Sequence, residues 1–313
     1  HMKQFLLILL PVILLINNAA AQGTATDWFN KGVKLNDSAR HSAAVTAYER
    51  AIALDANYSD AYYRLGWTYN ELAVYDKAIE KLIKALDLKK TDAFSMQELG
   101  YAYNKKGNYI EALNYLNKAI YQKPDYARAY KQLGDAYGGL KRNTEAITAY
   151  EKAYSLNNKD EGACYQAGYL YNATEKYELA LSWLNKAVAI KPTVSAYNEM
   201  GFANYKLLKN DEAFAGYKNA LLINPKNGTA YKGMGDVYRR NFKPAKTTEA
   251  IEQYKKAVMY NPKSSGSYFG LGWCYNETQN YDSAIANLKK ASELDPKLTA
   301  AFTELGYAQY MKG

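Results

Sequence analysis

The sequence predicts an all-α solenoid in which short helical hairpins stack one on another. Three observations predict this fold class: glycines recur about every 34 residues, two alanine positions follow each glycine, and five of the seven prolines fall at the ends of the repeats. A fixed period of this length is typical of repeat architectures, in which each repeat contacts only its neighbours. Hydrophobic residues make up 48% of the chain, which is enough apolar material for a core.

The repeat glycine is the first fixed position. Successive glycines are separated by 34, 34, 34, 34, 33, 34, 37 and 34 residues, and an aromatic residue usually stands four positions before each of them. Tyr usually stands three positions after the glycine. The repeat glycines are Gly32, Gly66, Gly100, Gly134, Gly168, Gly201, Gly235, Gly272 and Gly306.

Two small-residue positions are the second fixed feature, and all eight complete repeats have alanine at both. The first position holds Ala44, Ala78, Ala112, Ala146, Ala180, Ala213, Ala250 and Ala284, and the second holds Ala51, Ala85, Ala119, Ala153, Ala187, Ala220, Ala257 and Ala291. Proline can stop a helix. The prolines at the repeat ends are Pro124, Pro192, Pro225, Pro262 and Pro296.

Each repeat is therefore expected to form two amphipathic helices joined by a short turn. In the second repeat we expect the first helix over 60–73, and the second helix begins at Tyr75 with "YDKAIEKLIKALDL". One hairpin cannot bury its apolar face alone, so the repeats must stack into a single array over 25–313. The expected repeats are residues 25–58, 59–92, 93–126, 127–160, 161–193, 194–227, 228–264, 265–298 and a partial repeat at 299–313.

This pattern of an aromatic, Leu-Gly, Tyr, Ala, Tyr or Leu, Ala and Pro closely resembles the tetratricopeptide repeat. The resemblance covers residues 25–313. It implies a right-handed α-solenoid of about eight and a half helix-turn-helix repeats. It also implies that the first helix of each pair lines a concave inner surface.

The N-terminus predicts export. His1 ahead of Met2 indicates a cloning remnant, Lys3 forms a short positive region, residues 5–16 are apolar, and residues 19–21 are alanines. This is the pattern of a secretory signal peptide over 1–21, cleaved before Gln22. An uncleaved anchor is the alternative, but twelve apolar residues fall short of the roughly 20 that a spanning helix needs. We expect a soluble, exported bacterial protein, periplasmic or secreted.

The net charge indicates the kind of partner, and the positions of the cysteines indicate their oxidation state. The net charge of +9 becomes +8 without Lys3, which favours acidic partners, and export argues against nucleic acid. The two cysteines, Cys164 and Cys274, fall at core positions three repeats apart. A disulfide needs Cα atoms within about 7 Å. Repeats so far apart do not touch, so we expect two free thiols in the core.

Catalytic and cofactor motifs are missing from the sequence. His41 is the one native histidine, and it stands at a turn where other repeats have tyrosine. There is no zinc-type ligand spacing and no phosphate loop, and "GMGDVY" at 233–238 lacks the third glycine of a dinucleotide site. We expect a protein that is not an enzyme and that carries no metal and no cofactor.

The resemblance implies that residues three before, one after and four after the repeat glycine face the groove. Asn side chains there could donate to and accept from a peptide backbone, and aromatic rings supply rigid apolar area. The alternative is structural, because the aromatics could pack on the adjacent repeat and Asn is common near helix ends. The predicted peptide-binding groove comprises Tyr63, Trp67, Asn70, Tyr101, Asn104, Tyr165, Tyr169, Asn172, Phe202, Phe269, Trp273 and Asn276.

Repeats four and seven place charges at or near the same positions. The seventh also contains a three-residue insertion within "RRNFKPAKTTE", which adds Lys243 and Lys246. These charges could receive carboxylates of a partner. A solvated loop is the alternative for the insertion. The predicted charged groove patches comprise Arg128, Lys131, Asp135, Lys232, Asp236, Arg239 and Arg240.

We therefore expect a scaffold or adaptor that binds extended segments of cell-envelope proteins in its concave groove. One alternative is an envelope carbohydrate-binding protein that uses Trp67 and Trp273 as sugar platforms. Another is a structural solenoid that assembles end to end through its terminal helices.

Overall fold

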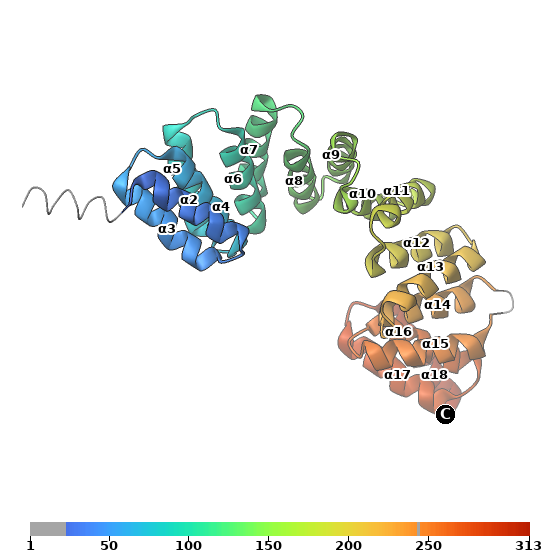
Figure 1. Ribbon diagram of the computed structural model, residues 1–313. Helices are drawn as coiled ribbons and strands as arrows, with labels where there is room; N and C mark the ends of the chain where they lie inside the picture. The colour runs from blue at the N-terminus through green and yellow to red at the C-terminus, as the bar shows by residue number, and fades with distance from the viewer. Residues whose placement is uncertain (1–22, 243–244) are drawn as a thin grey trace, which may run out of the picture. The chain divides into compact units, whose positions relative to one another are not determined.

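A computed structural model of the chain describes residues 23–242 and 245–313, and Figure 1 shows that these residues form helical hairpins. Within them there are seventeen α-helices and no strands, which confirms the predicted all-α class. The predicted signal peptide (1–21) and Lys243 lie outside the described residues. The chain divides into two compact units, His1–Asn157 and Asn158–Gly313.

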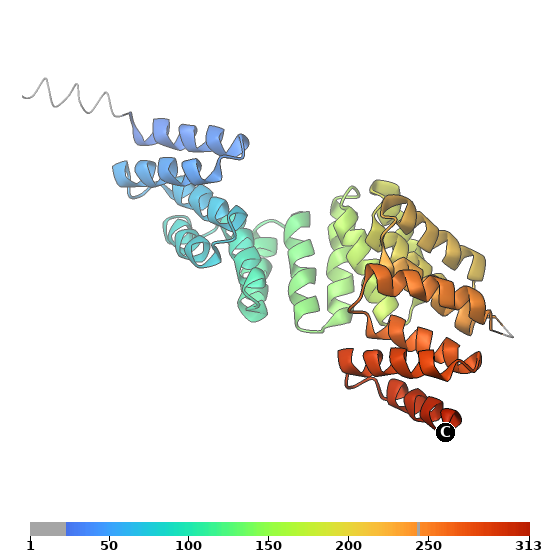
Figure 2. The same ribbon diagram turned by 90° about the horizontal axis from the view of Figure 1, so that it is seen from below.

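The first unit contains four helix pairs. In each pair the two helices run antiparallel and pack along their length (Figure 2). The helices are α2 (Ala25–Asp37), α3 (His41–Leu54), α4 (Ser59–Glu71), α5 (Tyr75–Leu88), α6 (Ala93–Lys105), α7 (Tyr109–Gln122), α8 (Ala127–Gly139) and α9 (Asn143–Leu156).

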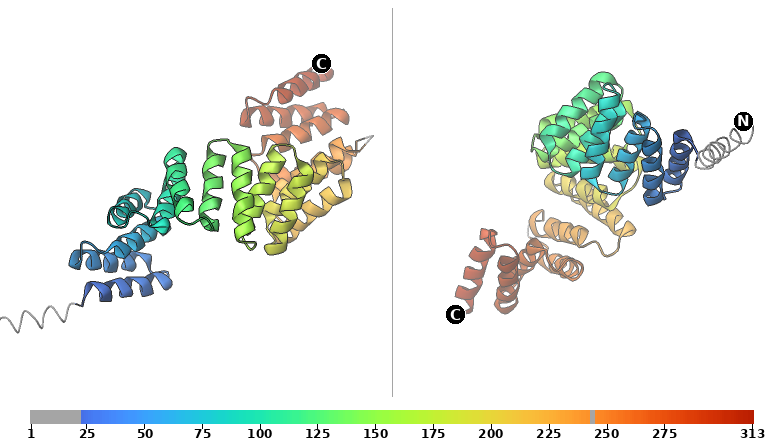
Figure 3. Two further views of the ribbon diagram at one scale, coloured as in Figure 1. Left: turned by 90° about the horizontal axis from the view of Figure 1, so that it is seen from above. Right: turned by 90° about the vertical axis from the view of Figure 1, so that its left-hand side faces the viewer.

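The second unit contains four further pairs and one more helix that packs on the last of them (Figure 3). The helices are α10 (Glu161–Ala173), α11 (Tyr177–Ile190), α12 (Val194–Lys206), α13 (Asn210–Ile223), α14 (Gly228–Arg240), α15 (Thr247–Tyr260), α16 (Ser265–Glu277), α17 (Tyr281–Leu294) and α18 (Thr299–Lys312).

The core follows the fixed positions of the repeat. All sixteen alanines of the two small-residue positions are fully buried. The repeat glycines allow still closer approach: a Cβ placed on Gly66 would lie 2.5 Å from Cγ of Leu82, and one on Gly32 would lie 2.5 Å from the ring of Tyr48. Pairs of helices in these repeats are therefore held close by residues that lack bulk, and Leu or Tyr of the second helix fills the space.

The two cysteines lie where the sequence places them. Cys164 and Cys274 are buried and free. Burial raises the pKa of the Cys164 thiol to about 11 and that of the Cys274 thiol to about 12. Both thiols therefore stay protonated at neutral pH and act as small apolar core residues.

In seven of the eight hairpins the turn contains one residue in the left-handed region, the exception among the described residues being the hairpin of α14 and α15. The φ of this residue is 75° at Gly107, 57° at Ala73 and 61° at Leu208. The next amide then reaches back into the first helix, as Lys209 N donates to Asn204 O at 2.9 Å. This is the hydrogen bond that closes a helix end with a left-handed residue.

Positive φ is unfavourable for leucine, and at Leu208 no core contact offsets this strain, because its side chain is 70% exposed. We expect Leu208→Gly to stabilise the protein by about 0.5 kcal/mol, since glycine adopts positive φ freely and loses only part of this gain to chain entropy in the unfolded state. Urea denaturation measures the change. Leu208→Ala keeps the Cβ, so it should bring no gain; an equal gain from both variants would contradict the explanation.

Candidate binding groove

The aromatic residues that follow the repeat glycine bridge adjacent repeats. Four of them pack edge to face against the aromatic or histidine ring that begins the second helix of the preceding repeat. Ring centroids are 6.1 Å apart for His41 and Trp67, 6.4 Å for Tyr75 and Tyr101, 6.2 Å for Tyr177 and Phe202, and 6.5 Å for Tyr281 and Tyr307.

These rings differ in how much surface they leave open. Trp67, Tyr101 and Trp273 are half-buried, whereas Phe202 is 37% exposed and Tyr169 is 44% exposed. Among the predicted groove residues, Tyr169 and Phe202 therefore leave more ring surface open to a partner than the two tryptophans do.

The asparagines four positions after the glycine also bridge repeats. Asn70 Nδ2 donates to the backbone O of Glu98 at 3.1 Å and to Glu98 Oε2 at 2.9 Å. The same pair of bonds joins Asn172 to Glu199 and Asn276 to Glu304. Asn104 Nδ2 donates to the backbone O of Gln132 at 2.8 Å. The amide N–H groups expected to form a ladder for a peptide are thus engaged within the chain.

Glu98 is the most buried member of this set, with its side chain 1% exposed. Burial raises its pKa, while the Arg128 charge and the Asn70 amide oppose that rise. Arg128 Nη2 lies 3.2 Å from Glu98 Oε1. The chain Asn70–Glu98–Arg128 therefore joins three successive repeats, and Arg128 of the predicted charged patch is the partner of a carboxylate inside the protein.

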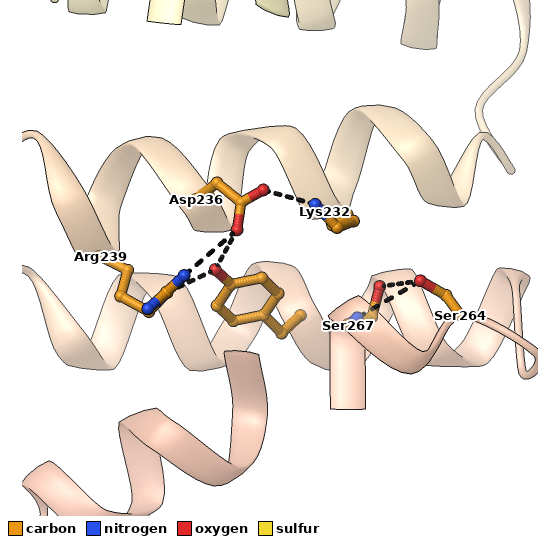
Figure 4. A network of polar contacts seen from close by, with 6 residues as sticks. Lys232, Asp236, Arg239, Ser264 and Ser267 are labelled. Atoms are coloured by element: carbon orange, nitrogen blue, oxygen red, sulfur yellow. Dashed lines mark hydrogen bonds and ion pairs between the residues drawn. The ribbon is translucent and has the colours of Figure 1, made fainter. Parts of the chain in front are cut away.

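The charged patch of the seventh repeat is also internally paired. Lys232 Nζ lies 2.6 Å from Asp236 Oδ2, and Arg239 approaches the other oxygen of Asp236 (Figure 4). Tyr254 OH donates to Asp236 Oδ1 at 2.6 Å and accepts from Arg239 Nε at 3.1 Å. The Arg239 side chain is 8% exposed, so little of it can reach a partner.

The other residues of the predicted charged patches lie on α8 and α14. In the fourth repeat Tyr150 OH donates to Asp135 at 2.7 Å, which matches Tyr254 and Asp236. Lys131 is half-buried on α8, and Arg240 is exposed at the last turn of α14.

Arg239 also covers two of the predicted groove aromatics. Its guanidinium lies 5.5 Å from the ring centroid of Phe269 and 5.2 Å from that of Trp273. Tyr165, by contrast, stacks on another ring, that of Tyr169, with 6.4 Å between the ring centroids. Phe269 and Trp273 thus face a cation of their own chain.

One cavity gathers a subset of the predicted groove residues. It has a volume of about 480 Å³ and lies among α10, α11, α12, α13 and α14; we call it the α10–α14 cavity. Its lining residues are Tyr169, Asn172, Ala173, Glu175, Tyr177, Asn198, Glu199, Phe202, Tyr205, Lys206, Tyr217, Thr229, Lys232, Gly233 and Asp236.

This cavity brings together Tyr169, Asn172, Phe202, Lys232 and Asp236 of the predicted set. The first unit holds a smaller cavity of about 310 Å³, which includes Tyr63 beside Asp60, Arg64 and Phe94.

The prediction from sequence missed two lining residues that bear on chemistry, Glu199 and Thr229. Glu199 stands two positions before the repeat glycine, where Glu98 and Glu304 also stand. The recurrence of Glu at that position was the signal available in the sequence.

Comparisons with known proteins agree with this architecture. Four tetratricopeptide repeat family models match the chain, over residues 47–80, 92–159, 161–193 and 272–313. The chain belongs to the tetratricopeptide repeat family. No curated protein matches it.

Solved structures of tetratricopeptide proteins share the fold. The APC/C hetero-tetramer Cut9-Hcn1 matches with a TM-score of 0.60 and 18% identity over 86% of this chain, and this chain spans 52% of that one. A tetratricopeptide repeat protein from Parabacteroides merdae ATCC 43184 matches with a TM-score of 0.59 and 17% identity, covering 80% and 98% of the two chains. MamA from Desulfovibrio magneticus RS-1 gives 0.50 and 22%, covering 53% and 94%.

The predicted all-α fold of stacked tetratricopeptide helix pairs is thereby confirmed. This fold is typical of protein–protein interaction, which points to protein or peptide partners, and tetratricopeptide proteins are generally non-enzymatic scaffolds. Across 23–242 and 245–313, no helix is long and apolar enough to cross a membrane. The same residues contain no cluster of three or more potential metal ligands.

Proposed function

We propose that this tetratricopeptide protein is an exported, non-enzymatic scaffold that binds extended segments of cell-envelope proteins along the inner face of its helix pairs. The observation that carries the proposal is the α10–α14 cavity. It joins exposed aromatic surface at Tyr169 and Phe202 to polar groups at Asn198 and Thr229. Cavities that combine apolar walls with a few polar groups are the usual binding sites of proteins.

The packing described above assigns the two kinds of predicted residue different parts in this function. Asn70, Asn172 and Asn276 hold adjacent repeats in register through Glu98, Glu199 and Glu304. The partner then binds the surface that these repeats expose, above all the exposed rings of Tyr169 and Phe202 in the cavity. The export step rests on the signal-peptide pattern over 1–21.

Photocrosslinking in cells tests the proposal. A benzophenone amino acid at Phe202 should capture a discrete envelope protein, because this ring faces the cavity and is partly open. The matched control carries the same probe at Tyr121, which is 83% exposed at the end of α7 and lies outside the cavity. Mass spectrometry identifies the product, and fractionation shows whether the protein reaches the periplasm.

Capture of the same species from both positions, or of nothing from Phe202, would contradict groove binding. Retention of the chain in the cytoplasm with residues 1–21 still attached would contradict export.

A further inference from the structure

Two repeats of the first compact unit can be aligned with two repeats of the second unit that lie three repeats further along the chain. Repeats three and four match repeats six and seven at an offset of 101 residues, from Gly100 to Gly201 and from Gly134 to Gly235. At this offset Glu98 corresponds to Glu199, and Arg128 corresponds to Thr229. The two units can therefore be compared position by position.

The carboxylate is kept in both units, fully buried at Glu98 and partly buried at Glu199, and so is the amide that donates to it. Asn70 donates to Glu98 Oε2 at 2.9 Å, and Asn172 donates to Glu199 Oε2 at 2.8 Å. In both glutamates burial raises the pKa and the Asn amide opposes the rise, but Arg128 adds its opposing charge only at Glu98.

The second unit has an uncharged residue at the position that corresponds to Arg128. Arg128 pairs with Glu98 at 3.2 Å, whereas the corresponding Thr229 is uncharged and lines the α10–α14 cavity together with Glu199. Among the described residues no Lys or Arg forms an ion pair with Glu199. A partly buried carboxylate without a cation is costly, and an incoming cation would relieve that cost.

Two other positions have also become smaller around this cavity. Gln97 and Tyr126 of the first unit, which hydrogen-bond to each other at 2.7 Å, correspond to Asn198 and Asn227. Asn227 Nδ2 still donates to Asn198 Oδ1, at 3.1 Å. The polar link is therefore kept while its side chains shorten, and Asn198 lines the cavity together with Glu199.

A fourth change is compensated within the protein. Gln132 corresponds to Gly233, and a Cβ on Gly233 would lie 2.2 Å from the ring of Tyr217. That ring takes the place of the smaller Leu116 and fills the space at Gly233. The space left by Arg128 has no such replacement, because Thr229 faces the cavity.

The two lysines that line the cavity are engaged by groups other than Glu199, so they leave this carboxylate available to a further cation. Lys232 is paired with Asp236 at 2.6 Å, and Lys206 lies over the rings of Tyr177 and Phe202 at 5.8 and 5.9 Å. Their counterparts Lys131 and Lys105 are present in the first unit, where Arg128 and Glu98 are paired all the same.

We propose that the α10–α14 cavity binds an arginine side chain of the partner polypeptide, with its guanidinium on Glu199 in the place that Arg128 takes beside Glu98. The inference rests on the proposed function and names the chemistry of its ligand. Arginine fits better than lysine because its planar group binds a carboxylate through two hydrogen bonds and stacks on aromatic faces such as those of Tyr169 and Phe202. The same chain already places Arg239 against Phe269 and Trp273.

Panning a random twelve-residue peptide display library on the intact protein tests this. The wild type should enrich peptides that share an arginine. Replacing that arginine with uncharged citrulline should weaken binding about tenfold or more, since it removes a charge-assisted bond to a partly buried carboxylate. Thr229→Arg should abolish the enrichment by supplying the cation from within, and Glu199→Gln should reduce it.

Thr248→Arg is the matched control, because Thr248 is exposed on α15 outside the cavity and gains the same charge. It should bind like the wild type, and thermal melts should show that all variants are folded. Enriched peptides that lack arginine, or that bind Thr229→Arg unchanged, would overturn the inference and leave the proposed function standing. A library from which nothing is enriched on the wild type would overturn both.

Discussion

Replacing Gly100 with Ala should destabilise the protein by about 2 to 3 kcal/mol, as expected for an overpacked core. The new Cβ would lie 2.4 Å from Cγ and 2.7 Å from Cδ2 of Leu116. Leu116 is fully buried, so its branch point cannot swing aside, and α6 and α7 must move apart to relieve the overlap. Loss of the close contact would then extend to the flanking repeats, since each repeat is stabilised by its neighbours.

The control is the same substitution at Gly138 on α8, where a Cβ would have no atom within 4 Å. There Ala should stabilise by up to about 1 kcal/mol, because it favours the helix more than Gly does. Urea denaturation followed by circular dichroism measures both variants. Equal effects of the two substitutions would show that helix propensity, and not the approach of α7, decides the role of the repeat glycine.

The elements of the fold could be predicted closely from the sequence because the repeat encodes them many times. The sequence predicts that the second helix of repeat two begins at Tyr75, and this helix spans Tyr75–Leu88. The sequence predicts the first helix of this repeat over 60–73, and the helix spans Ser59–Glu71. The difference falls at the turn, where Ala73 adopts positive φ, and nothing about alanine signals that conformation.

The candidate site is harder to predict from the sequence than the fold, because its chemistry depends on contacts between repeats. Asn70 reads as a free amide in the sequence, but it faces Glu98, 28 residues away. Asp236 and Arg239 read as an open charged patch until Tyr254 of the next helix is placed between them. Periodicity shows which positions are equivalent, but only the packing shows which of them point at each other.

Replacing Arg128 with Ala should destabilise the protein by about 1 to 3 kcal/mol at neutral pH, because it leaves the Glu98 carboxylate buried without its cation. The lower part of this range is expected, since the Arg128 side chain is 48% exposed and solvent screens the pair. At about pH 4 the cost should largely disappear, because Glu98 can then be buried as the neutral acid.

The direction follows from the pKa of Glu98, which burial raises above its ordinary value while Arg128 and Asn70 oppose the rise. A carboxyl whose pKa is higher in the folded than in the unfolded state contributes stability below the unfolded pKa, and that stability is lost as pH rises through the folded pKa. Without Arg128 the folded pKa rises further, so the variant loses more than the wild type over the range from about pH 4 to neutrality. In a Glu98→Gln background, Arg128→Ala should lower the free energy of unfolding only slightly at any pH. Urea denaturation across that range compares Arg128→Ala in the wild-type background with Arg128→Ala in the Glu98→Gln background. A cost that does not change with pH would mean that Arg128 acts through the packing of its alkyl chain and not through its charge on Glu98.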